Sequence, residues 1–431
     1  MAGILLFGAG KSATSLIRYL IAAAGPRGWQ LTVADSNLSL VQSKIGGAAN
    51  ARAASLSVEE ESERDRLVGT ADVVISLLPP SLHHLVARSC LRAGKHLLTA
   101  SYTDDSIRAM KPDIDRSGKL FLCEMGLDPG IDHMSALHFI DKVRRLGEAI
   151  VSFHSHTGGL IAPESDDNPW HYKISWNPRN VVRAGASGAR FRADGRVVER
   201  SYAELFEQTG RINLKETGPL AWYPNRDSLP YMALYSLEGV ETFIRTTLRY
   251  PVFCKGWAPI VRAGLTDDVQ PLKDAGGSVF APRALTIAHW SAPLLPYVDE
   301  HNRKLYEYLG LFSPAPVPAN ARTSADVLQF LLETRLKMRP RDRDMIVMQH
   351  EIGCSSGASY KSTLVVKGED SLDTAMARTV GLPLGIAAKL LLDGKLSLTG
   401  LQIPVSPELY VPVLKELELQ GIGFEEEGPV G

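Results

Sequence analysis

A glycine-rich turn near the start of the chain is the first stretch whose residue types and spacing could do chemistry. Apolar residues 4–7 lead into the sequence GAGKSA, in which Gly8 permits a tight turn, Gly10 lets the backbone approach a ligand, and Ala13 stands where a third glycine is common. The helical pattern that follows would present free N–H groups and the positive end of its dipole. Strand, turn, helix and second strand follow in register, so the pattern predicts a dinucleotide pyrophosphate site.

Asp35 ends the second strand pattern and bears on the choice of dinucleotide. A carboxylate at this place accepts hydrogen bonds from the adenosine ribose 2′-hydroxyl and repels a 2′-phosphate. Positions 35–37 hold no Arg or Lys that could pair with such a phosphate. The pattern therefore favours NAD over NADP. The alternative is that Asp35 is a turn-former before Ser36 and Asn37.

Polar residues follow two later strand patterns, where a substrate would meet the nicotinamide. The stretches are LLTASY at 97–102 and GLDPGIDH at 126–133. Asp128, Pro129 and Gly130 also make a good turn by themselves, so a purely structural role stays open for them.

Two arginines stand beside turn and strand residues further along the chain, in YPNRDS and TTLRY. Guanidinium groups bind carboxylates through two parallel hydrogen bonds. Arg226 and Arg249 together therefore indicate a substrate with two or three carboxylates.

Three other motifs contain residues that could have a function. The stretch GGLIAPESDDNPWHYKISW is rich in Gly, Pro and polar residues, which is typical of long loops over a site. His154 and His156 share one strand face, but no third ligand is near them in the sequence, so we expect no metal. The GxSxG pattern at 353–357 lies between two strand patterns and is expected to be a hairpin loop.

The elements that must position these residues change in character along the chain. Apolar strands alternate with amphipathic helices over residues 1–127, which predicts a Rossmann-type doubly wound parallel sheet, an α/β fold. Residues 128–370 hold alternating strands, including WHYKISW and TFIRTTLRYPVF and a hairpin turn at Asp194-Gly195, with a helical insertion at about 283–340. The helical segment 371–431 is expected to pack back on the first domain.

Composition excludes several classes of protein. The 431 residues carry 47 Lys and Arg against 48 Asp and Glu, which argues against a broad basic surface for nucleic acid. No apolar run approaches the ~18–20 residues of a membrane span, so no membrane partner is expected. The four cysteines lie far apart, as in a protein of the reducing cytoplasm. A small-molecule substrate remains the expected partner.

In their order along the chain, the motifs GLDPGIDH, GGLIAPESDDNPWHYKISW, YPNRDS and TLRY resemble the saccharopine reductases, also called L-glutamate-forming saccharopine dehydrogenases. The resemblance runs essentially end to end. It implies a Rossmann domain completed by the carboxyl terminus and a second α+β domain with a large mixed sheet and a helical insertion. We also expect a homodimer through that sheet. It also implies NAD(P)-dependent interconversion of saccharopine with 2-aminoadipate 6-semialdehyde and glutamate.

The glycine turn, the end of the second strand pattern and the resemblance together give the candidate site residues. Those at the cofactor are Gly8, Gly10, Lys11, Ser12, Ala13, Thr14, Asp35, Ser36, Ser57, Val58, Leu78, Ala100, Ser101, Leu127, Asp128, Pro129 and Asn177. Those at the substrate are Ser101, Tyr102, Asp128, Arg226, Thr247, Leu248 and Arg249. We expect Asp128 or Tyr102 to be the acid-base group that moves the amine proton.

Two departures from the family pattern leave alternatives open. Asp35 and Ser36 replace a Cys-Arg pair whose arginine serves the NADP phosphate, and Thr157 replaces a cysteine near the substrate. One alternative is a related imine-reducing dehydrogenase of the opine or carboxyspermidine type. Another is a dinucleotide-binding regulatory protein without turnover.

Overall fold

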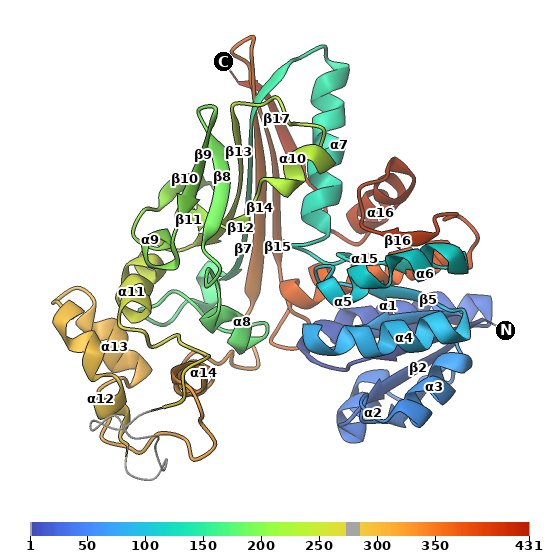
Figure 1. Cartoon of the computed structure of the whole chain (residues 1–431), viewed down its shortest axis with the longest axis horizontal. Helices are drawn as coiled ribbons and strands as arrows, with labels where there is room; N and C mark the ends of the chain where they lie inside the picture. Colours follow the sequence, from blue (N-terminus) through green and yellow to red (C-terminus); the bar gives the residue numbers. More distant parts are fainter. Residues whose placement is uncertain (1, 273–284, 431) are drawn as a thin grey trace. The chain divides into compact units, whose positions relative to one another are not determined.

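The computed structural model describes residues 2–272 and 285–430, which form two compact units (Figure 1). The first unit is Met1–Gly147 with Leu372–Glu425, and the second is Glu148–Ser371 with Glu426–Gly431. Each unit has its own sheet, so each is described by itself.

The first unit is built on a seven-stranded sheet with the order β16-β6-β5-β4-β1-β2-β3. All of its neighbouring strands run parallel. The strands are β1 Gly3–Phe7, β2 Gln30–Asp35, β3 Ala51–Ser55, β4 Val73–Ser76, β5 His96–Thr99, β6 Leu120–Leu122 and β16 Gly400–Gln402. The predicted doubly wound α/β fold is thus confirmed, although the short edge strand β3 was not foreseen.

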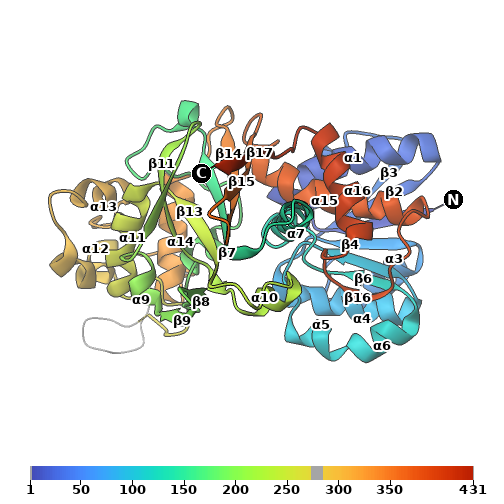
Figure 2. The ribbon, with the colours of Figure 1, turned by 90° about the horizontal axis from the view of Figure 1, so that it is seen from above.

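Helices cover both faces of this sheet, as a parallel sheet requires. Figure 2 shows α1 and α15 above the sheet and α4 and α6 below it. The helices are α1 Thr14–Ala24, α2 Leu38–Ile45, α3 Glu61–Gly69, α4 His83–Ala93, α5 Asp105–Ala109, α6 Lys111–Ser117, α7 Ile131–Arg145, α15 Ala375–Leu392 and α16 Pro407–Leu419.

Helix α15 lies directly against α1 because two glycines allow the approach. A Cβ atom on Gly385 would lie 2.6 Å from the Tyr19 ring, and one on Gly381 would lie 2.9 Å from the Leu16 Cβ. With 18 residues and a mean hydropathy of 1.4, α15 has the length and composition of a membrane span, contrary to our sequence analysis. Most of it is buried inside the unit, as in the core helix of a soluble protein.

The boundaries between units differ from those expected. The first unit extends to Gly147 instead of 127, because α7 packs against α16. The Tyr410 hydroxyl on α16 donates a hydrogen bond to Asp141 on α7, at 2.5 Å. The carboxyl-terminal segment is also divided: residues 372–425 belong to the first unit, whereas strand β17 (Glu425–Val430) joins the second sheet next to β15.

The second unit is built on a ten-stranded mixed sheet whose main path is β10-β11-β13-β7-β14-β15-β17, with β8, β9 and β12 at one side. Strands β13 and β7 are parallel, whereas β7 and β14 are antiparallel. The strands are β7 Ile150–Ile161, β8 Ala189–Ala193, β9 Arg196–Arg200, β10 Gly210–Leu214, β11 Gly218–Pro224, β12 Arg226–Asp227, β13 Thr242–Arg249, β14 Asp344–Cys354 and β15 Ser359–Lys367. The mixed sheet implied by the resemblance is confirmed.

Two hairpins of this sheet turn at the residues that the sequence predicted. Asp194 and Gly195 have φ values of 49° and 76° between β8 and β9, as a two-residue hairpin turn needs. The GxSxG pattern forms the loop of the β14–β15 hairpin, as predicted.

One expected strand was wrong, and another ends earlier than expected. In WHYKISW only Ile174 makes a bridge, to Lys337, because its aromatic side chains are buried in a helical core and are not one face of a sheet. In TFIRTTLRYPVF the strand ends at Arg249, and Pro251 begins helix α11 (Pro251–Arg262).

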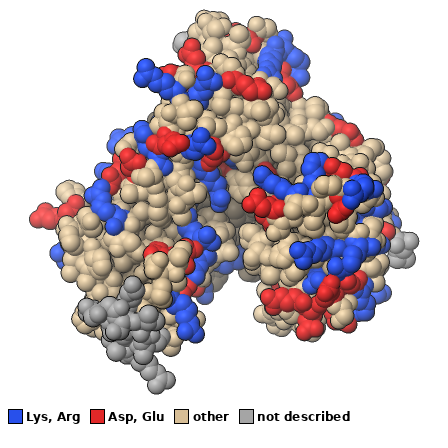
Figure 3. Space-filling view, viewed as in Figure 1, with Lys and Arg blue, Asp and Glu red and all other residues tan. Residues whose placement is uncertain are grey.

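The remaining helices of the second unit include the helical insertion. They are α8 Pro178–Val182, α9 Tyr202–Leu205, α10 Pro230–Leu234, α12 Ile287–Trp290, α13 Arg303–Leu309 and α14 Ser324–Arg335. The expected first residues of the insertion, 283 and 284, lie outside the described residues. On the face drawn in Figure 3, basic and acidic side chains are interspersed.

Candidate active site

The glycine turn has the geometry of a phosphate cradle. Gly8 has a φ of 99°, and its N–H donates to the Ala34 carbonyl at 2.9 Å. A Cβ atom there would lie 2.9 Å from the Leu77 carbonyl, so only glycine fits. Beside Gly10 nothing lies within 4 Å of the Cβ direction, which leaves the backbone open to a ligand. Residues Lys11–Ala13 then form a 3-10 turn that leads into α1.

Asp35 braces this turn. Its carboxylate accepts the Ala9 N–H at 2.8 Å and the Asn37 N–H at 2.9 Å. The group is therefore held as a fixed hydrogen-bond acceptor at the end of β2, beside the exposed Ser36. The turn-forming role and the ribose-binding role are compatible, because each carboxylate oxygen has two lone pairs.

Lys44 is a basic residue that the sequence analysis missed. From the last turn of α2, its ammonium donates to the Gly10 carbonyl at 2.5 Å and to the Thr14 hydroxyl at 3.0 Å. Burial lowers the pKa of Lys44 to about 8, and the nearby Asp35 carboxylate opposes that shift. The residue escaped notice because helix α2 was not recognised in the sequence, so nothing placed Lys44 beside the turn.

Other residues assigned to the cofactor follow the ends of different strands. Ser57 and Val58 follow β3, Leu78 follows β4, and Ala100 follows β5. Leu127 and Pro129 follow β6. Because the carboxyl ends of parallel strands lie at one edge of a sheet, the fold gathers these positions at the edge where ligands of such sheets bind.

His83, a buried histidine that was not among the predicted site residues, forms hydrogen bonds with two serines at this edge. His83 accepts or donates through Nδ1 to the Ser76 hydroxyl and through Nε2 to the Ser101 hydroxyl, both at 2.8 Å. Burial lowers the pKa of His83 to about 4, so the ring is neutral at pH 7. His83 therefore fixes Ser101, a residue assigned to both cofactor and substrate, relative to β4.

His83→Gln should flatten the pH dependence of stability. The folded-state pKa lies below the unfolded value of about 6.5, so the unfolded chain binds the proton more readily, and stability falls as pH drops through this window. Between pH 7 and about pH 5.5, wild type should lose about 1 kcal/mol more of its free energy of unfolding than the variant. Urea unfolding at both pH values measures this. A His83→Gln slope equal to that of wild type would contradict the assignment.

Tyr102 and Asp128 meet in the structure. The Tyr102 hydroxyl donates to the Asp128 carboxylate at 3.0 Å, and both side chains are half-buried. The loop that carries Asp128 is tightly closed, since Gly126 donates to the Pro129 carbonyl at 3.0 Å. Gly130 has a φ of 144°, and a Cβ atom on it would lie 2.1 Å from the Gly126 carbonyl oxygen. A phenol hydrogen-bonded to a carboxylate at this edge can accept and return a proton.

Glu124 is a buried carboxylate that links the segments carrying this pair. One of its oxygens accepts the N–H and the hydroxyl of Thr103, each at 3.1 Å, and the other lies 3.1 Å from His133 Nε2. Burial alone would raise the pKa of Glu124. The hydrogen bonds from His133 and Thr103 and the charge of His133 have the larger combined effect, so the pKa of Glu124 is lowered. Glu124 thus ties the segment after β5 to the segment after β6.

In the second unit, Arg249 is a buried guanidinium. It is 3% exposed, and its side chain lies 5.4 Å from the Tyr172 ring centre and 5.6 Å from that of Phe253. Nη1 donates to the Leu248 carbonyl at 2.8 Å, whereas Nε has no hydrogen-bond partner. Within residues 2–272 and 285–430, no carboxylate pairs with Arg249. A buried charge without a counter-ion is costly, so a ligand carboxylate is the natural partner.

The other candidate site residues of the second unit differ in exposure and in the direction of their side chains. Thr247 is half-buried on the same face of β13 as Arg249. The Leu248 side chain lies on the opposite face, in a separate apolar cluster, so only its backbone remains for the Arg249 side. Asn177 is exposed, and its side chain caps α8 by accepting the Arg179 N–H at 2.9 Å.

Arg226 is exposed and has a φ of 54°, a left-handed conformation that is strained for a non-glycine residue. Strain of this kind is concentrated at functional sites. Its backbone pairs with Ala189 of β8, which holds the conformation in place.

The loop rich in Gly and Pro packs partly into the core of the second unit. Trp170 within it is fully buried, and its indole N–H donates to the Leu305 carbonyl at 2.8 Å. Tyr172 lies against the Arg249 guanidinium. Lys173 is buried between Asp167, at 2.8 Å, and Asp342, at 2.7 Å. The loop thus packs Tyr172 against Arg249 and places Trp170 in the core of the second unit.

Comparison with known proteins gives consistent results. A family model described as "Saccharopine dehydrogenase NADP binding domain" matches residues 4–122, and "Saccharopine dehydrogenase C-terminal domain" matches residues 126–422. The chain is 34% identical to a saccharopine dehydrogenase [NADP(+), L-glutamate-forming] of Saccharomyces cerevisiae, over 98% of both chains. It is 33% identical to the mitochondrial alpha-aminoadipic semialdehyde synthase of Bos taurus, over 99% of this chain and 48% of that protein. A solved apo structure of the yeast L-Glu-forming enzyme superimposes with a TM-score of 0.84, covering 99% of each chain at 33% identity.

Proposed function

The chain belongs to the saccharopine dehydrogenase family, and we propose that it interconverts saccharopine with 2-aminoadipate 6-semialdehyde and glutamate, using NAD or NADP. It is an oxidoreductase of the NAD(P)-dependent saccharopine dehydrogenase type. The observation that carries the proposed substrate is Arg249, a buried guanidinium with no carboxylate partner among the described residues. Saccharopine has three carboxylates, and one of them would supply the missing counter-ion.

The proposed chemistry assigns a task to each group. In the direction of oxidation, the substrate ammonium must lose a proton before the neighbouring carbon can give up hydride. The nicotinamide, when bound, supplies the hydride acceptor. The Asp128 carboxylate takes the proton, and the Tyr102 hydroxyl, which donates to it at 3.0 Å, keeps it oriented. The resulting imine takes up water and separates into the aldehyde and glutamate.

The cofactor fits the open backbone at Gly10 and the amino end of α1. Two opposite charges bear on the choice between NAD and NADP. The fixed Asp35 carboxylate repels a 2′-phosphate, and the Lys44 ammonium attracts one. We propose that the Asp35 carboxylate makes NAD the preferred cofactor, because the Lys44 ammonium already donates hydrogen bonds to Gly10 and Thr14. The Saccharomyces cerevisiae relative is named for NADP(+), whereas in this chain Asp35 and Ser36 stand where the resemblance places a Cys-Arg pair.

Asp35→Ala combined with Ser36→Arg should shift the cofactor preference toward NADP. The double change removes a fixed carboxylate and adds a guanidinium for the 2′-phosphate. We expect the ratio of kcat/KM for NADP over NAD to rise about tenfold or more, which is about 1.4 kcal/mol. Lys44→Met should lower the same ratio. If the double variant leaves the ratio unchanged, Asp35 does not face the ribose.

The proposed reaction is tested by mixing the purified chain with saccharopine and either NAD or NADP and following the near-ultraviolet absorbance of the reduced nicotinamide. Turnover with either cofactor supports the proposal. Binding of dinucleotide without turnover of saccharopine would favour another imine-forming substrate, of the opine or carboxyspermidine type, or a regulatory protein. The homodimer and the cytoplasmic location stay predictions.

A further inference from the structure

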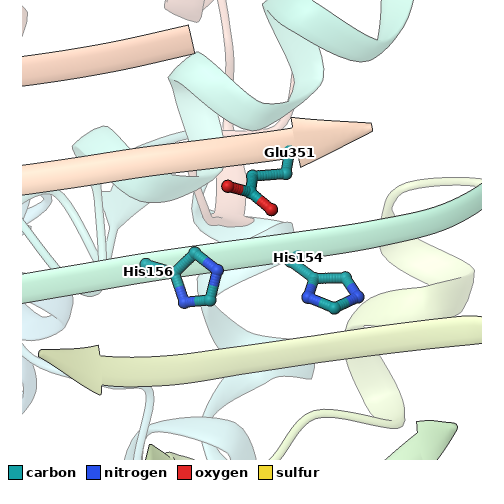
Figure 4. A group of neighbouring side chains, drawn as sticks. All are labelled: His154, His156 and Glu351. Atoms are coloured by element: carbon teal, nitrogen blue, oxygen red, sulfur yellow. The ribbon is translucent and has the colours of Figure 1, made fainter. Parts of the chain in front are cut away.

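A second cluster of chemically active side chains lies on the large sheet of the second unit. His154 and His156 project from β7, and Glu351 projects from β14. One donor atom from each of the three lies within 4.8 Å of the other two. Figure 4 shows the Glu351 carboxylate turned toward the two imidazoles.

The register of the sheet creates this cluster. His154 and His156 are two residues apart, so they share a face of β7, and Glu351 is the direct antiparallel partner of His154. Thr247 and Arg249 occupy alternate positions of β13 from Thr246, whose hydroxyl contacts His156. The cluster and Arg249 therefore lie on opposite faces of the sheet.

His156 is oriented as a metal ligand is. It is 1% exposed, and its Nδ1 lies 2.7 Å from the Thr246 hydroxyl. That bond fixes the ring and leaves Nε2, which is buried and has no hydrogen-bond partner. Metal-bound histidines characteristically use one nitrogen for the ion and the other for such a second contact. An unpartnered buried nitrogen is otherwise costly, and a cation satisfies it.

The charges of the cluster also suit a cation. Burial lowers the pKa of His154, and burial together with the charges of neighbouring groups lowers the pKa of His156. Glu351 contributes one negative charge. The Lys361 ammonium on β15 lies 3.3 Å from the Glu351 carboxylate and competes with a metal for it.

We infer that His154, His156 and Glu351 bind one divalent transition-metal ion of the zinc class. Two imidazoles and one carboxylate are a common zinc donor set that leaves a fourth position for water. Donors around zinc are about 3.3 Å apart, so small rotations of the half-exposed His154 and Glu351 side chains close the set. Hard cations such as Mg²⁺ and Ca²⁺ prefer oxygen ligands and should not compete.

The test uses the full chain without a histidine tag. Equilibrium dialysis against Zn²⁺ should show one saturable equivalent bound in the presence of excess Mg²⁺. His154→Gln and Glu351→Gln should each weaken binding about tenfold or more. His301→Gln, an exposed histidine of the same unit, should leave binding unchanged. Co²⁺ in place of Zn²⁺ should give the visible absorption bands of a tetrahedral site, and both variants should lose them.

Lys361→Gln adds an opposite expectation, since removal of the competing ammonium should tighten Zn²⁺ binding several-fold. Binding that survives both His154→Gln and Glu351→Gln, or an absence of saturable binding, would overturn the site. His156→Gln is the variant most exposed to a folding defect, because the ring is buried against Trp222 at 5.6 Å. The other two variants decide the question without it. None of these readouts depends on turnover, so they stand apart from the proposed reaction.

Discussion

Asp128→Asn should lower kcat for the oxidation of saccharopine by about 100-fold or more, because general acid-base catalysis contributes on that scale. The asparagine side chain has nearly the same shape and can still accept the Tyr102 hydrogen bond, which is 3.0 Å long in the wild type. It cannot take the substrate proton. Steady-state rates over a range of pH measure the effect, and the variant should also lose the limb of the pH profile that belongs to this group.

Tyr102→Phe is the matched comparison. It removes the hydroxyl that orients Asp128 but leaves the carboxylate, so kcat should fall less than in Asp128→Asn and the pH profile should keep its form. If Asp128→Asn retains wild-type kcat with an unchanged pH profile, the proton moves through another group. If Tyr102→Phe is the more damaging change, the phenol is the acid-base group and Asp128 positions it.

The parallel sheet was accessible from the sequence because its signals are local. Continuous apolar strands and the Gly8 turn are each contained in a few residues, and the steric demand at Gly8 is visible in the structure as a contact with Leu77. The edge strand β3 was missed because ARAAS is rich in alanine and has neither the apolar run nor the alternation of a buried strand. The boundary between the units was expected at residue 127, before α7. Helix α7 belongs to the first unit because it packs against α16, which lies more than 250 residues later in the chain.

The candidate site shows the same difference between local signals and contacts that only the fold creates. Asp128 and Tyr102 were both proposed, and the structure joins them, because both follow strand ends that the fold brings to one edge. His83, Lys44 and Glu124 were missed, since each acts through a contact with a residue from another element. Glu351 is the clearest case. Nothing in the sequence links it to His154, because only the register of β7 with β14 does so.

Arg249→Met should separate substrate binding from stability. Methionine keeps an unbranched stem between Tyr172 and Phe253 but removes a buried charge that has no counter-ion among the described residues. Such replacements of buried ions by apolar side chains are often neutral or stabilising. The ligand-free variant should therefore unfold at the same or a higher urea concentration than wild type.

The same Arg249→Met change should raise KM for saccharopine by about 10- to 100-fold, because a hydrogen-bonded charge on the ligand carboxylate is worth about 1.5–3 kcal/mol. Arg226→Ala is the companion variant: Arg226 is exposed, so KM should rise without a change in stability. A purely structural Arg249 would behave in the opposite way, with a loss of stability and an unchanged KM. That outcome would remove the buried guanidinium from the substrate site and leave Arg226 as the remaining carboxylate partner.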